Sequence, residues 1–159
     1  GDALGGGLEA LLSFDFIIAE ESTSFGLPEI LFGLFPGMGA HAFLSRQLGS
    51  VAAERLITSG KTLSAQEMLA LGLVHDVVPD GTGEEAVQTF IEKNARRHAG
   101  LLGSRRAIKR SWNLSLAELT EITEIWADTA LKLTERDLKL MGRLASKQSR
   151  AVEKVREDA

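Results

Sequence analysis

The stretch GDALGGGLE, residues 1–9, is the part of the sequence that decides the fold. Three consecutive glycines followed at once by apolar and acidic residues predict a tight turn that opens a helix, because glycine adopts turn conformations at little steric cost. A domain rarely begins inside such a turn. We therefore expect that the strand normally preceding it is missing from the sequence.

The composition is that of a globular protein. The chain has 159 residues, of which 44% are apolar and 25% are charged, and its formal net charge is -4. This length indicates one domain, or one domain with a small appendage. The lack of cysteine excludes a disulfide scaffold and a thiolate metal site. No apolar run could span a bilayer and no signal peptide is recognisable, so we expect a cytoplasmic protein without a membrane partner.

Acidic and basic residues are unevenly distributed along the chain. The charged residues in 1–91 are mostly acidic, whereas residues 92–159 contain most of the lysines and arginines. In the segment 92–110 the charged residues are almost all basic. This segment is either a solvated helical face or a patch for an acidic partner or a phosphate-bearing cofactor. No nucleic-acid motif accompanies it, so we do not expect nucleic acid to be a partner.

Hydrophobic periodicity predicts an α/β protein that is mostly helical in its second half. Buried strands are expected at residues 14–19 and 73–78. Apolar residues recurring every three or four positions predict one long helix over residues 115–147. Shorter helices are expected at residues 40–48, 50–59, 64–72, 84–98 and 101–112. Two strands are too few for an independent sheet, which again suggests missing strands.

Two sequence patterns that can mark a phosphate or metal site are incomplete in this chain. Gly60-Lys61-Thr62 resembles the end of a P-loop, but the glycine required five positions earlier is replaced by Arg55. The three histidines, His41, His75 and His98, are too widely spaced to suggest a metal site. We therefore expect no metal and no redox cofactor.

Two glutamates lie next to glycine-containing turns. Glu9 follows Gly6 by three residues, and Glu29 follows Pro28 at another predicted helix start. Peptide N–H groups are unpaired at helix starts, so the N–H of Gly6 could hold an oxyanion while Glu9 acts on neighbouring atoms. A second carboxylate opposite would complete an acid/base pair. The alternative is structural, because glutamate in a first helical turn and glycine in close packing both stabilise folds without catalysis.

Five segments, in order and with matching spacing, resemble the crotonase (enoyl-CoA hydratase/isomerase) superfamily. They are GDALGGGLE at 1–9, FDFIIA at 14–19, FGLPEI at 25–30, FPGMG at 35–39 and TSGKTLSAQEMLALGL at 58–73. The resemblance covers nearly the whole chain but only the C-terminal half of a crotonase domain. It implies a partial crotonase-like ββα superhelix with its N-terminal strands missing, at residues 1–112, followed by a C-terminal helical oligomerisation region at residues 113–159.

A narrower resemblance is to the diffusible signal factor synthases. It rests on GLPEILFGLFPGMGA at 26–40, NARRHAG at 94–100 and the arginine pair at 105–106. This branch implies dehydration of a 3-hydroxyacyl thioester on acyl carrier protein and hydrolysis of the thioester. The product would be a cis-2-unsaturated fatty acid that serves as a quorum-sensing signal.

The resemblance also implies roles for individual residues. Gly6 would supply one oxyanion-hole N–H, and Glu9 and Glu29 would be the two catalytic glutamates. One glutamate would remove the C2 proton while the other protonates the departing 3-hydroxyl, and the sequence does not assign which does which. Four apolar residues could line an acyl tunnel, although core packing is the more common role of such residues and is favoured for most of them: Leu8, Leu31, Leu34 and Met38.

The implied partners are acyl-CoA or acyl carrier protein, and further copies of the chain in a trimer or a hexamer. Two other functions stay open. One is an ordinary enoyl-CoA hydratase or isomerase of fatty-acid metabolism. The other is a non-catalytic oligomerisation or partner-binding module that uses the 115–147 helix and the basic 92–110 segment. In the superfamily a second oxyanion N–H comes from the N-terminal half, so we expect this chain alone to be inactive.

Overall fold

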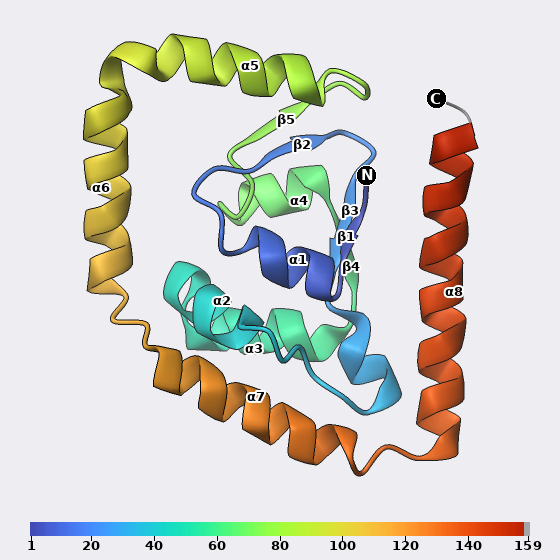
Figure 1. Cartoon of the computed structure of the whole chain (residues 1–159). Helices are drawn as coiled ribbons and strands as arrows, with labels where there is room; N and C mark the ends of the chain where they lie inside the picture. Colours follow the sequence, from blue (N-terminus) through green and yellow to red (C-terminus); the bar gives the residue numbers. More distant parts are fainter. Residues whose placement is uncertain (158–159) are drawn as a thin grey trace.

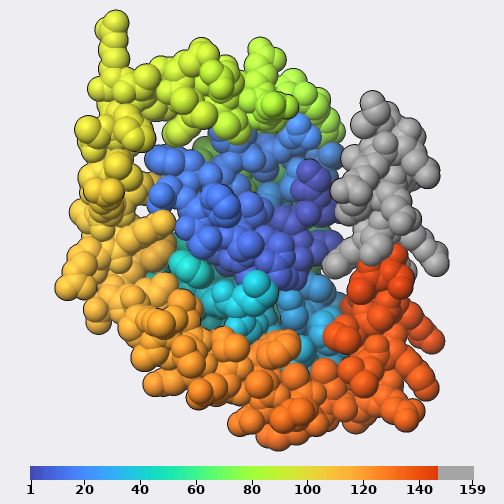
Figure 2. Space-filling view, viewed as in Figure 1, coloured from blue at the N-terminus to red at the C-terminus, as the bar shows by residue number. Residues whose placement is uncertain are grey.

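The computed structural model describes residues 1–157, with side chains described through residue 146. A small α/β core occupies the centre, and four long helices run around it as an open frame (Figure 1). In the space-filling view the frame forms a rim around the N-terminal residues (Figure 2). The α/β class, mostly helical in the second half, is as the sequence predicts.

Two small sheets form the centre of the core. In the first, β1 (Ala3–Leu4) pairs in parallel with β3 (Ser24–Gly26), which pairs antiparallel with β4 (Thr62–Ser64). In the second, β2 (Ile18–Glu20) pairs in parallel with β5 (Asp76–Val78). Because β1 leads directly into the glycine turn, the pairing of β1 with β3 fixes where the next helix begins.

Short helices pack between and beside these sheets. Their bounds are α1 (Gly6–Leu11), η1 (Pro28–Phe32, a 3-10 helix), α2 (Ala40–Leu48), α3 (Ser50–Ser59) and α4 (Ala65–Ala70). Local sequence explains their ends. Pro28 starts η1 in the position that tolerates a missing N–H. Ser64 and Glu67 form the predicted capping box of α4, and Gly60 ends α3 in the left-handed conformation.

A hydrophobic core joins these elements. It is built from α1, the central strands and the inner faces of α2, α3 and α4. Its largest fully buried side chains include Leu8, Leu12, Phe25, Ile57 and Met68. Burial of one such side chain contributes roughly 1.5–3 kcal/mol. The core therefore holds α1, which begins at the glycine turn, in a fixed position.

The frame contains α5 (Gly83–Asn94), η2 (Ala95–Arg97), α6 (His98–Ser111), α7 (Leu116–Ala130) and α8 (Glu135–Glu157). No residue of α5, α6 or α7 is fully buried. Some large apolar side chains on these helices and at their ends face solvent; Leu116, in α7, and Leu131, just after it, are 81% and 85% exposed. Within the described part of the chain, no helix is both long and apolar enough to cross a membrane.

The predicted helices at 40–48 and 50–59 are confirmed, but both predicted strands are too long. In these two parts of the chain, strand pairing is limited to residues 18–20 and 76–78. Phe16 instead packs beside the rings of His75 and Phe90. Leu73 is buried in the turn that follows α4. Apolar runs of this kind indicate burial without distinguishing a strand from a buried turn.

The prediction of one continuous helix over residues 115–147 is wrong. The helix ends at Ala130, and a new one begins at Glu135. The N–H of Thr134 donates to Asp137 Oδ2 at 2.9 Å, and the N–H of Asp137 donates to Thr134 Oγ1 at 3.4 Å. This reciprocal cap restarts the helix in a new direction. The predicted domain boundary at 112/113 falls in the link between α6 and α7.

Candidate active site

The glycine turn brings Glu29 close to the start of α1. Gly5 has φ 56° and ψ -128°, and its N–H donates to Gly26 O at 2.8 Å. A side chain at Gly5 would place its Cβ 2.9 Å from Glu29 Oε1. Residues with a Cβ rarely adopt this backbone conformation. Glycine is therefore required here both by the backbone and by the approaching carboxyl group.

Glu9 is held in place by the second glycine loop. The side chain is only 3% exposed, and its Oε1 accepts hydrogen bonds from the N–H of Met38 at 2.7 Å and of Ala40 at 3.1 Å. Burial raises the pKa of Glu9 above its usual value, and the hydrogen bonds from Ala40 and Met38 partly oppose that rise. Gly39, with φ 115°, turns the chain so that both N–H groups point the same way.

Glu29 is less firmly held. Its Oε2 is buried and has no hydrogen-bond partner among the described residues. Burial raises the pKa of Glu29, its own backbone N–H opposes the rise, and the negative charge of Glu9 adds to it. The two carboxyl groups are thus close enough to affect each other. When one is ionised, the other retains its proton more readily.

Glu9, Glu29 and Gly6 line one cavity of about 330 Å³. The Gly6 N–H is in the first turn of α1 and has no acceptor among the residues that the structure describes. The remaining walls come from η1, the 36–39 loop, α7 and α8, and they are largely apolar: Phe32, Leu34, Gly37, Met38, Thr123, Trp126 and Met141. The cavity can therefore hold an apolar chain with its reactive end beside two carboxyl groups.

Two of the four predicted tunnel residues lie in this cavity and two do not. Leu34 and Met38 are part of its lining. Leu8 is 2% exposed and belongs to the hydrophobic core, on the side of α1 that faces the sheets. Leu31 is 52% exposed and lies beside Gly60. On a helix, neighbouring residues point in different directions, so Leu8 and Glu9 face different surroundings.

Sequence analysis did not predict the contribution of α7. Trp126 packs against Gly37, so closely that a Cβ on Gly37 would collide with its ring. Thr123 Oγ1 lies 3.1 Å from Gly37 O and 2.9 Å from Leu119 O, so its single proton is shared between these two acceptors. Trp126 and Met141 both belong to the series of apolar residues, three or four positions apart, that predicted the C-terminal helix. That series alone does not show which of its side chains face the site.

The sequence is similar to known hydratases. A family model described as enoyl-CoA hydratase/isomerase matches residues 1–134. A probable enoyl-CoA hydratase of Rhizobium meliloti is 41% identical over 119 residues, which cover 74% of this chain and 46% of that protein. The 2,3-dehydroadipyl-CoA hydratase of Escherichia coli is 37% identical over 117 residues, which cover 73% of this chain and 46% of that protein.

Solved structures show the same similarity. A carnitinyl-CoA hydratase from Mycobacterium avium matches with a TM-score of 0.73 and 32% identity, over 94% of this chain and 57% of that chain. An enoyl-CoA hydratase from Bacillus anthracis matches with a TM-score of 0.64 and 35% identity, over 94% and 57%. The fold is therefore that of the crotonases, as predicted. The chain belongs to the enoyl-CoA hydratase/isomerase family, and it spans about half the length of the curated relatives it matches.

Proposed function

We propose that the protein adds water to the C2–C3 double bond of an acyl-CoA thioester, or removes it in the reverse direction. The observation that carries this proposal is that Glu9, Glu29 and the Gly6 peptide line one largely apolar cavity. Relatives named as enoyl-CoA hydratases support the same reaction class. The scheme requires no metal and no redox cofactor.

Each group has a part in this reaction. The Gly6 N–H would donate to the thioester oxygen and stabilise it as negative charge develops. One glutamate, as a carboxylate, takes a proton from water while the water oxygen bonds to C3. The electrons of the C2–C3 double bond move to the thioester oxygen. The other glutamate, protonated, then gives its proton to C2 as the carbonyl re-forms.

The environment of the two carboxyl groups suits a reaction in which one glutamate is the base and the other is the acid. Glu9 and Glu29 both have pKa values raised by burial, so a protonated carboxyl persists closer to neutral pH. The negative charge of Glu9 raises the pKa of Glu29 further. One proton shared between two carboxyls is the state that the proposed reaction needs.

The test uses a chimaera in which the N-terminal half of the Rhizobium meliloti relative precedes residue 1, because the second oxyanion donor is expected from that half. Loss of the enoyl-thioester absorbance measures hydration. Glu9→Gln and Glu29→Gln should each lower kcat by roughly 100-fold to 10,000-fold. Exposed Glu84→Gln on α5 is the matched control. Unchanged turnover in both site variants would rule out the proposed roles of the two glutamates, and no turnover by the parent chimaera would favour a non-catalytic binding module.

The second candidate is the dehydratase and thioesterase of the signal-synthase branch. It is favoured by the sequence resemblance at residues 26–40 and by the apolar cavity wall, which includes Phe32, Leu34 and Trp126 and suits a fatty acyl chain. The names of the relatives support the hydratase better. Product analysis separates the two functions, because free unsaturated acid indicates the synthase and a retained thioester indicates the hydratase.

We also propose that the protein self-associates through the frame helices, as a trimer or a pair of trimers. The exposed apolar side chains of α7 support this proposal. An acyl carrier protein, the alternative carrier of the substrate, would find basic groups on α6. The relatives named as hydratases of CoA thioesters favour CoA as the carrier.

A further inference from the structure

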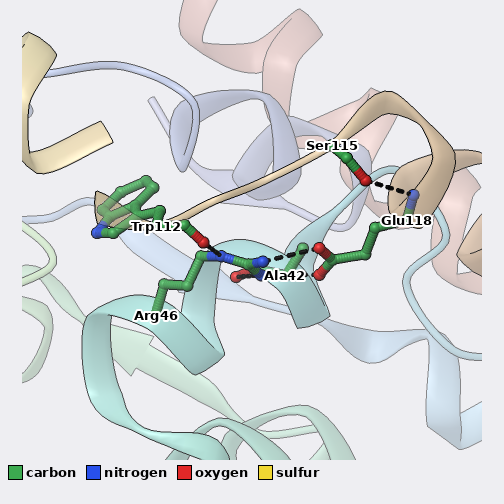
Figure 3. Close-up of polar contacts among 5 residues, drawn as sticks. All are labelled: Ala42, Arg46, Trp112, Ser115 and Glu118. Atoms are coloured by element: carbon green, nitrogen blue, oxygen red, sulfur yellow. Dashed lines mark hydrogen bonds and ion pairs between the residues drawn. The ribbon is translucent and has the colours of Figure 1, made fainter. Parts of the chain in front are cut away.

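Arg46 joins three helices near the candidate site. Its Nε donates to Trp112 O at 2.7 Å, at the end of α6, and its Nη1 donates to Ala42 O at 3.0 Å, within α2. Nη1 and Nη2 donate to the two carboxylate oxygens of Glu118, on α7, at 2.8 and 2.7 Å. Figure 3 shows this guanidinium between the start of α7 and α2. A bidentate pair of this kind fixes orientation as well as distance.

The Glu118 carboxylate binds Arg46 instead of capping its own helix. The sequence Ser115-Leu116-Ala117-Glu118 has the pattern of a capping box, in which the glutamate side chain bonds back to the serine N–H. In the structure only the serine half forms, with the Glu118 N–H donating to Ser115 Oγ at 3.1 Å. The Glu118 carboxylate binds Arg46 instead. The start of α7 is thereby tied to α2 rather than capped by its own residues alone.

The contacts continue from α7 to Glu9. Thr123 and Trp126, one and two turns beyond Glu118, hold Gly37 through a hydrogen bond and close ring packing. Gly37 precedes Met38, whose N–H donates to Glu9 Oε1. The second N–H on Glu9 comes from Ala40, the first residue of α2, the helix that carries Arg46. Arg46 therefore ties α2, which supplies the Ala40 N–H, to α7, which packs against the loop that supplies the Met38 N–H.

We propose that Arg46, through Glu118, is a positioning residue that keeps the 36–40 backbone aligned on the Glu9 carboxylate. The inference rests on the proposed function only in treating Glu9 as an acid/base group. An isolated exposed ion pair contributes little to a fold. This pair differs because it is bidentate, partly buried and continued by two backbone hydrogen bonds.

The test compares Arg46→Met and Glu118→Gln with the parent chain, and with Lys109→Met as control. Lys109 forms an ion pair of similar length with Asp15, at 2.8 Å, away from α7. Hydrogen exchange of the Met38 and Ala40 amides is measured by NMR, and the carboxyl carbon of Glu9 is titrated. Loss of alignment should speed exchange at both amides by about tenfold, the effect of weakening one hydrogen bond to a charged group. The Glu9 pKa should rise in the same variants.

The outcomes separate a positioning role from a merely structural one. Faster exchange at Met38 and Ala40, a raised Glu9 pKa, unchanged amides in the core helix α3, and no added effect in the double variant support the proposal. Exchange that is unchanged at these amides, that rises equally in Lys109→Met, or that rises throughout the core overturns it. If Arg46→Met does not fold, the same measurements are made on Arg46→Lys. That variant keeps the charge but loses the bidentate hydrogen bonds. None of these measurements requires turnover, so they fail or succeed independently of the proposed hydration.

Discussion

Gly5 and Gly7 lie in the same turn but differ in what a side chain would meet. At Gly5 a Cβ would combine a positive φ with a contact 2.9 Å from Glu29 Oε1. At Gly7 nothing lies within 4 Å of the added atom, and φ is not positive. The two positions therefore form a matched pair for testing whether the turn conformation, rather than small size alone, is required.

We expect Gly5→Ala to lower the free energy of unfolding by about 1–3 kcal/mol, the cost of holding a residue with a Cβ in a backbone conformation that is almost exclusive to glycine. It should also displace Glu29 from the cavity. Gly7→Ala should stabilise the chain by about 0.5–1 kcal/mol, because alanine is the better helix former. Chemical denaturation measures both. Equal effects of the two substitutions would contradict the interpretation of the turn.

The raised pKa of Glu29 predicts a pH-dependent effect on stability. Because its folded-state pKa lies above the ordinary 4.5, the folded state binds the proton more tightly than the unfolded state. Its contribution to stability is therefore full below pH 4.5 and is lost as the pH rises through the folded-state pKa. Glu29→Gln should stabilise the chain relative to the parent at neutral pH and lose this advantage in acid. Urea denaturation at both pH values measures this, and equal stability of parent and variant at neutral pH would contradict it.

At the level of elements, the cap at Thr134 decides the direction of α8. Thr134 Oγ1 also donates to Asp137 Oδ2 at 2.6 Å. These hydrogen bonds hold the pKa of Asp137 below its usual range. Because α8 carries Met141 to the cavity wall, the cap contributes to the shape of the site.

We expect Thr134→Ala to cost about 0.5–2 kcal/mol of stability, as for loss of other helix caps. Hydrogen exchange should rise in the first turn of α8 while the core keeps its protection. Thr129→Ala is the control, because the Thr129 hydroxyl bonds only to Ile125 O within its own helix. A similar loss of protection in both variants would show that the cap does not hold α8.

Local signals predicted the elements better than they predicted the site. Gly60, Ser64 and Glu67 act within a few residues of the chain, so the sequence alone indicates where α3 ends and α4 begins. Thr134-Glu135-Arg136-Asp137 is a signal of the same kind, and it was hidden by an apolar stripe that continues across it. By contrast, the contact of Trp126 with Gly37 joins segments far apart in the sequence. No local pattern indicates such a contact.

The predicted site residues also divide into those placed by local turns and those whose direction depends on distant parts of the chain. Gly6, Glu9 and Glu29 lie near turns whose geometry is set by glycine and proline, and the structure brings them to one cavity. Their catalytic roles stay predictions. Leu8 and Leu31 were candidates only because they are apolar and adjacent to these residues. Which way an apolar side chain points depends on the tertiary fold around it.

At the level of the whole molecule, the frame exposes apolar surface that a core would normally cover. We expect the 17.1 kDa chain to self-associate, with a measured mass that is a multiple of three chains. Leu116→Lys and Leu131→Lys should shift it towards the monomer, because both side chains face solvent on the frame. Val51→Lys, on the exposed face of α3, is the control. Light scattering after size-exclusion chromatography measures the mass, and a monomeric parent chain would contradict the expectation.

The resemblance implies a second oxyanion donor from the N-terminal half of a crotonase domain. We therefore expect hydration by the 159-residue chain to be much slower than by the chimaera. Removing one such donor lowers kcat by roughly 100-fold to 1000-fold. The chimaera with the N-terminal half should restore turnover. Turnover by the isolated chain at the rate of the chimaera would contradict this prediction.

Glu29 Oε2, which has no hydrogen-bond partner among the described residues, gives the cavity an energetic preference among ligands. A buried oxygen without a donor costs about 1–3 kcal/mol, and a ligand that brings a hydroxyl to it recovers that cost. A 3-hydroxyacyl thioester supplies such a hydroxyl, whereas the saturated thioester does not. The hydroxylated ligand should therefore bind about tenfold more tightly, a discrimination set by one unsatisfied atom rather than by the size of the cavity.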